Sequence, residues 1–157
     1  MWDAGPLDTL SWQNGTHSDA GKVKGRHGRL DRDSDHHQGP RSVAATVARL
    51  TGILSAKGMK VFAVIDQSEE AREAGQQLRE TTLVIFGSPA AGTPVMDAAP
   101  LAALDLPLKI LIWADGSRTN VTYYSPAAIA ARYGLSAELA AKLAGIDPLT
   151  DALIAGW

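Results

Sequence analysis

Hydrophobic positions are sparse over the first 40 residues of the chain and dense after them. Residues 1–40 show neither the 3.6-residue period of an amphipathic helix nor the two-residue period of a strand. A segment with so few apolar side chains buries too little surface to offset the entropy lost on ordering. The pattern therefore predicts a disordered or poorly ordered tail over residues 1–40 and a folded domain beyond it.

From residue 41 onward, helical and strand patterns alternate in the order α-β-α-β-α-β-β-α-α-α. The first helix follows Ser42, a residue type that caps helices, and ends near Gly58. Strands are predicted over residues 59–65, 81–86, 109–113 and 120–124, and the last two are joined by a tight turn at Asp115 and Gly116. Further helices are predicted from residue 68 and over residues 95–104, 126–133, 136–145 and 147–155.

This order of elements predicts an α+β fold, a two-layer α/β sandwich. We expect a mixed sheet of about four strands with an antiparallel hairpin, and helices packed mainly on one face. Residues 41–135 form the α/β domain in this interpretation, and residues 136–157 form a C-terminal helical extension packed on it. A length of 157 residues is about that of one domain.

Composition narrows the classes of function. A net charge of −2 provides no basic patch for nucleic acid or an anionic membrane, so neither partner is expected. The chain has no cysteine, which excludes disulfides, thiolate metal sites and cysteine nucleophiles. No apolar stretch is long enough to cross a membrane and no signal-peptide pattern is present, so the predicted location is cytoplasmic.

All four histidines, His17, His27, His36 and His37, fall in the predicted tail. The adjacent pair could bind a metal ion together with Asp33 and Asp35, or it could be solvated. We favour solvated side chains, because adjacent residues point in different directions and a disordered segment cannot orient their rings. The sequence thus predicts no metal site, no cofactor and no histidine base in the domain.

Three features of the domain could carry chemistry. Asp66, Asp97, Asp105 and Asp115 lie at the ends of elements, where turns and active sites both use aspartate. Lys109 begins a very apolar strand, so it must reach solvent, pair with Asp105 or Asp66, or act as a nucleophile of lowered pKa.

The third feature is the predicted loop over residues 87–94, which is rich in Gly and Pro. It either makes a tight connection, with glycine supplying positive φ and Thr93 capping a helix, or contacts a ligand. Together with Tyr124, these features supply the candidate ligand-binding residues: Asp66, Gly87, Ser88, Gly92, Thr93, Asp105, Lys109 and Tyr124.

A set of residue blocks carries a family resemblance: Thr46…Arg49-Leu50, Gly58…Val61-Phe62-Ala63…Ile65-Asp66, Ala71…Ala74-Gly75…Leu78-Arg79…Thr81, Phe86-Gly87-Ser88-Pro89…Gly92-Thr93-Pro94…Met96, Leu104-Asp105-Leu106-Pro107-Leu108-Lys109, Trp113, Tyr123, Tyr124, Pro126 and Arg132. Through these blocks the chain resembles the bacterial and archaeal family known as domain of unknown function 302. The resemblance implies a compact α/β sandwich that forms homodimers, and it implies no established activity. The chain departs from the family at Gln67 and Tyr133, where relatives often carry histidine, and it lacks an evident strand before the first helix.

Two functional hypotheses follow. The first is a non-catalytic, homodimeric domain that binds a small molecule or another protein. The second is an enzyme that uses carboxylate and lysine chemistry at Asp66, Asp105 and Lys109. Convergence of these three side chains beside residues 87–94 would favour a site, whereas separate pairing of each would favour structural roles.

Overall fold

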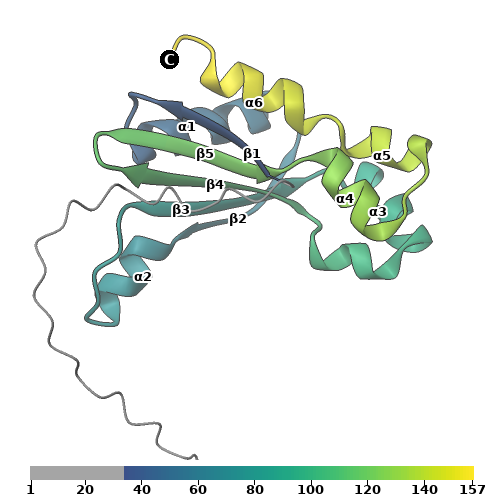
Figure 1. Cartoon of the computed structure of the whole chain (residues 1–157), viewed down its shortest axis with the longest axis horizontal. Helices are drawn as coiled ribbons and strands as arrows, with labels where there is room; N and C mark the ends of the chain where they lie inside the picture. The colour runs from purple at the N-terminus through teal and green to yellow at the C-terminus, as the bar shows by residue number, and fades with distance from the viewer. Residues whose placement is uncertain (1–33) are drawn as a thin grey trace, which may run out of the picture.

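The computed structural model describes residues 34–157, which form one antiparallel sheet with helices on one face and at one end (Figure 1). The strand order across the sheet is β1-β5-β4-β3-β2. The strands are β1 (Ser34–Gly39), β2 (Lys60–Asp66), β3 (Thr81–Gly87), β4 (Leu108–Asp115) and β5 (Arg118–Tyr124). The helices are α1 (Val43–Ala56), α2 (Gln67–Glu73), α3 (Pro89–Ala98), the 3₁₀ helix η1 (Pro100–Leu104), α4 (Pro126–Tyr133), α5 (Ala137–Leu143) and α6 (Ile146–Ile154).

Helices α1 and α6 cover one face of the sheet. The Ser42 hydroxyl caps α1 by accepting a hydrogen bond from the Ala45 N–H. The buried stripe of α1, which includes Leu50 and Leu54, packs on β2, β3 and β4, and α6 packs beside α1. Fully buried residues on the covered face of the strands include Val84, Phe86, Ile110, Ile112 and Val121. Alternation along each strand thus places one side of the sheet in the core.

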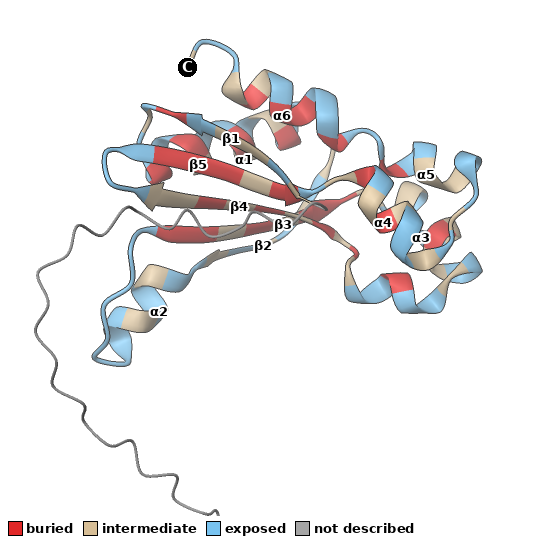
Figure 2. Cartoon of the chain, viewed as in Figure 1, coloured by how far each residue is buried: buried red, intermediate tan, exposed pale blue. Residues whose placement is uncertain are grey.

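On the opposite side of the sheet, here called the open face, none of the helices within residues 34–157 packs over the centre (Figure 2). Its side chains are half-buried, and the residues that form it include His36, Leu83, Ile85, Lys109, Leu111, Trp113 and Thr122. Tyr124 is 42% exposed on the same side. The pattern of polar and apolar positions therefore correctly predicts an α+β fold with one-sided helix cover.

The sheet differs from the sequence-based prediction in two ways. It has five strands where about four were expected, and every pairing is antiparallel, so the sheet is not mixed. The additional strand is β1, which pairs along its whole length with β5. Residues 34–39 of the predicted tail are therefore part of the sheet; the rest of that prediction, residues 1–33, lies outside the described residues.

The sequence pattern does not predict β1, because this strand contains no aliphatic side chain. Its sequence, Ser-Asp-His-His-Gln-Gly, lacks the apolar alternation of a half-buried strand. Main-chain hydrogen bonds to β5 hold it, and its two imidazoles contact aromatic rings on opposite faces. The His36 ring lies 6.1 Å from that of Trp113, and the His37 ring stacks 6.2 Å from that of Tyr123.

Most of the predicted loop 87–94 also belongs to regular structure, since Gly87 ends β3 and residues 89–94 lie in α3. Helix α3 begins at Pro89, because proline at the first helical position has a suitable φ and its missing N–H needs no partner there. Helix α2, predicted from residue 68, begins at Gln67, ends at Glu73 and buries no side chain.

One close contact fixes β1 against the residues that follow α6. The ring of Trp157 lies over Gly39, where a Cβ atom would fall 1.8 Å from the nearest ring carbon. Gly39 is buried and is the last residue of β1. Only glycine permits this approach, so the indole covers the strand end directly.

We expect Gly39→Ala to destabilise the domain by about 1–3 kcal/mol, because the new methyl group must displace the Trp157 ring. Urea unfolding of Gly39→Ala, Trp157→Ala and the double variant tests this contact. In the double variant, the alanine at position 39 should add almost no further loss, since the obstructing ring is gone. Additive losses would contradict the proposed cause.

Candidate functional site

The structure separates the predicted site residues into three places. Asp105, Lys109 and Tyr124 line one cavity, while Gly87, Ser88, Gly92 and Thr93 line a second. Asp66 lies at the other end of the sheet, because it pairs with Thr82 in β3, and Thr82 in turn pairs with Ile112 near the end of β4. The three residues of the enzyme hypothesis therefore do not converge.

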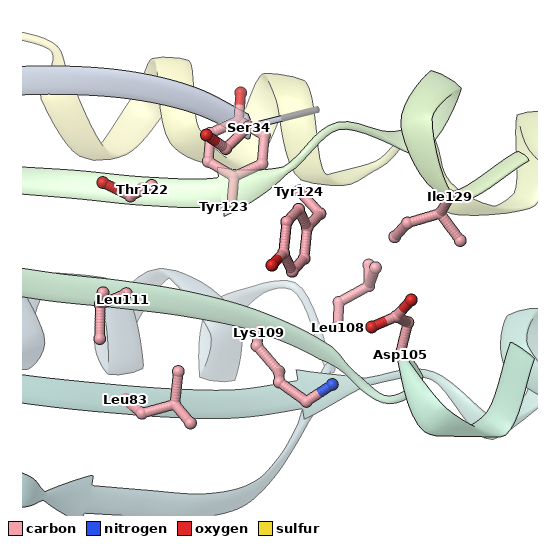
Figure 3. Close-up of a pocket in the computed structure, with 10 residues that line it drawn as sticks. All are labelled: Ser34, Leu83, Asp105, Leu108, Lys109, Leu111, Thr122, Tyr123, Tyr124 and Ile129. Atoms are coloured by element: carbon pink, nitrogen blue, oxygen red, sulfur yellow. The ribbon is translucent and has the colours of Figure 1, made fainter. Parts of the chain in front are cut away.

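The first cavity, here called the open-face cleft, has a volume of about 260 Å³. It lies where β4 and β5 approach η1 and α4, and Figure 3 shows the Tyr124, Lys109 and Asp105 side chains directed into this region. Its other lining residues are Ser34, Leu83, Leu108, Leu111, Thr122, Tyr123 and Ile129. The antiparallel register places Leu83, Leu111 and Thr122 in one row, which forms the apolar floor.

Asp105 accepts hydrogen bonds from two residues of α4. The Tyr133 hydroxyl lies 2.7 Å and the Arg132 Nη1 atom 2.9 Å from its Oδ2 atom. Partial burial acts to raise the pKa of Asp105, but these two hydrogen bonds and the charges of Arg132 and Lys109 outweigh it, so the pKa is lowered. The carboxylate is consequently a fixed anion at neutral pH.

Arg132 and Tyr133 are functional neighbours that sequence reasoning missed, because they follow Asp105 by 27 and 28 residues and no motif links them. Arg132 does not belong to any cluster of charged residues in the sequence, yet its guanidinium also lies 5.2 Å from the centre of the Tyr124 ring. The sequence feature that could have indicated this site is Tyr133, which stands where the family resemblance leads one to expect histidine.

Lys109 does not form the ion pair expected from the sequence. Within residues 34–157 no carboxylate lies at ion-pair distance from its ammonium group, which instead donates to the Leu104 carbonyl at 3.4 Å. Its aliphatic stem crosses the half-buried open face while the charge reaches the cleft, as expected for a lysine that emerges from an apolar strand. The cleft thus contains a cation that is available to a ligand.

The second cavity, here called the α3 pocket, has a volume of about 300 Å³. It lies between the start of α3, the end of α5 and the segment that enters β4, and Leu108 lines both cavities. Gly87 does not have the positive φ expected of it; a Cβ atom there would meet Pro107 at 3.5 Å, an ordinary contact. Glycine at this position therefore leaves space beside the pocket, and its backbone does not adopt a conformation that requires glycine.

The remaining candidates have structural roles. The Asp66 carboxylate caps α2 by accepting from the Glu69 N–H at 3.0 Å, and Asp115 lies 3.7 Å from Arg79. His36 and His37 belong to the domain after all, but they face opposite sides of the sheet and cannot share a metal ion as a pair. No group of three metal-ligating side chains occurs within residues 34–157.

Comparison with known proteins places the chain in a family. The sequence profile of Domain of unknown function DUF302 matches residues 36–153, so the chain belongs to this family and the resemblance is confirmed. The match includes β1 together with α5 and α6, and so extends beyond residues 41–135 on both sides. The crystal structure of an uncharacterized conserved DUF302 protein from Bacillus stearothermophilus has the same fold, with a TM-score of 0.67 and 18% identity over 78% of this chain and 96% of that one.

Two curated relatives have closer sequences. The fluoride-specific ion channel FluC 1 of Brucella suis biovar 1 (strain 1330) is 41% identical over 104 residues, which cover 64% of this chain and 41% of the relative. FluC 2 of Brucella melitensis biotype 1 has the same identity over 38% of its length. The chain thus spans about two-fifths of these relatives. In the part of the chain that the structure describes, every helix is too short or too polar to cross a bilayer.

We expect Asp105→Asn to lower stability at pH 7 by about 1 kcal/mol, a modest loss because the Arg132 partner is partly exposed. A lowered folded-state pKa means that the stabilisation is complete above the ordinary carboxyl pKa near 4 and is lost as the pH falls through the folded value. The difference between wild type and variant should therefore shrink as the pH falls from the ordinary carboxyl range through the lowered folded-state pKa. Urea unfolding at several pH values measures it; an equal difference at pH 7 and at low pH would contradict this account.

Proposed function

We propose that the protein is a non-catalytic, homodimeric binding domain whose open-face cleft takes a small molecule with a negatively charged group. The observation that carries the proposal is the Lys109 ammonium, which has no carboxylate at ion-pair distance among residues 34–157 and lies beside the exposed ring of Tyr124, above an apolar floor. Small-molecule sites are typically apolar cavities of a few hundred cubic ångströms with a few placed polar groups, as this cleft is.

The arrangement of charges favours binding over catalysis. Asp105 is held by Arg132 and Tyr133, and its lowered pKa keeps it ionised, so it is poorly suited to donate a proton near neutral pH. Asp66 caps α2 at the far end of the sheet and cannot assist Lys109. The enzyme hypothesis is therefore reduced to a reaction that uses Asp105 and Lys109 without Asp66.

The names of the relatives favour a second candidate, in which the domain serves fluoride transport. The support is the 41% identity to proteins named fluoride-specific ion channels, together with the cation in the cleft. In this version the anion that Lys109 binds is fluoride itself. Fluoride, with chloride as its control, therefore belongs among the ligands tested.

We expect a thermal-shift screen of anionic metabolites and fluoride to raise the melting temperature, because binding to the native state stabilises it by mass action. Lys109→Met should keep the fold, since it retains the apolar stem, and should abolish the shift. Lys57→Met, the same change at an exposed lysine that lines neither cavity, is the matched control and should respond as wild type.

Three outcomes of this screen are distinguishable. A shift that persists in Lys109→Met would overturn the cleft as the binding site. Turnover of a bound compound that Lys109→Met abolishes would establish the enzyme instead. A shift with fluoride but not with chloride or metabolites would favour the second candidate.

The open face also supports the homodimer, because half-buried Leu83, Ile85, Leu111 and Trp113 form an apolar surface across β3 and β4. A second copy packed there would bury this surface and cover the cleft. We expect Leu111→Glu to give a monomer by light scattering coupled to size exclusion, while Ala48→Glu on the exposed side of α1 remains dimeric. A monomeric wild-type protein would contradict the dimer.

A further inference from the structure

The α3 pocket is separate from the open-face cleft, although both adjoin Leu108. Its apolar lining includes Met59, which directly precedes β2, and Phe62, Met96 and Leu143, which come from β2, α3 and α5. Methionine side chains are flexible and polarisable, so a pocket built with two of them adapts to an aliphatic ligand. Phe62 is 44% exposed, so its ring is available to a ligand.

Small residues leave the pocket open. Gly87 and Gly92 line it, and a Cβ atom at Gly92 would touch the terminal methyl group of Met96 at 3.7 Å. A larger side chain at position 92 would therefore project into space that is now free. Ala90, on the same helix, is exposed and does not line the pocket.

The charges around the pocket have one sign. Lys142 is the only charged residue that lines it, and no carboxylate within residues 34–157 is ion-paired with this lysine. A second ammonium group, that of Lys60, lies 4.8 Å from the centre of the Phe62 ring. A ligand with an apolar body and one negative end would match both the lining and these two cations.

The size of the pocket limits the ligand. A pocket of about 300 Å³ lies at the lower end of the range found for small-molecule sites, so it suits a medium-length aliphatic chain better than a larger apolar body. We infer that the α3 pocket binds a medium-chain aliphatic carboxylate, with the hydrocarbon chain between Met59, Met96 and Leu143 and the carboxylate at Lys142.

Titration calorimetry with octanoate, octanol and octylamine tests this inference. Octanoate should bind best, octanol more weakly and octylamine least, because only the carboxylate complements the two lysines. Lys142→Met should weaken octanoate binding several-fold and leave octanol binding unchanged. Equal binding of octanoate and octylamine would overturn the assignment of the charged end.

Two further variants locate the binding. Gly92→Leu should reduce octanoate affinity at least tenfold by filling the pocket, whereas Ala90→Leu should bind as wild type; circular dichroism checks that both are folded. Lys109→Met should also bind octanoate as wild type, which separates this pocket from the open-face cleft. Octanoate binding lost in Lys109→Met but kept in Gly92→Leu would overturn the inference and place the ligand in the cleft. Absence of octanoate binding by the wild-type protein would overturn it outright.

Discussion

Burial of a single face of the sheet is the constraint on which the rest of the structure depends. Val84, Phe86, Ile110, Ile112 and Val121 are fully buried beneath the helices, and they account for the strand order and register. A slip of one residue would exchange the two faces and expose this whole set. The same constraint leaves the opposite face half-exposed, and that face provides the open-face cleft.

The segment that enters β4 links the core to both cavities. Leu106 and Leu108 are buried; Asp105, just before them, faces α4, and Lys109, just after them, faces the cleft. Leu108 lines the open-face cleft and the α3 pocket alike. A ligand in one cavity would thus contact the same core residue as a ligand in the other.

The two cavities offer different electrostatic environments. The cleft combines a cation, Lys109, with an anion, Asp105, whose charge is fixed by Arg132 and Tyr133. The α3 pocket has a cation and no anion in its lining. The open-face cleft suits a ligand that carries polar groups of its own, and the α3 pocket suits an apolar chain with one acidic end. Family membership alone assigns neither role, because the family has no established activity.

The sequence alone was sufficient to predict the elements with strong apolar periods: α1 with its Ser42 cap, strands β2 to β5 and the turn at Asp115 and Gly116. It was also sufficient to predict that helices cover one face of the sheet and to indicate the family. These features depend on local spacing and on burial, which the order of residues encodes directly.

Only the tertiary structure identified β1, whose polar residues are held by hydrogen bonds to β5 and by aromatic rings distant in the sequence. It alone paired Asp105 with Arg132 and Tyr133, and it alone divided the eight candidate residues between two cavities and a helix cap. These arrangements join residues that are far apart along the chain. No local period records such contacts, because they depend on which elements pack against one another in three dimensions.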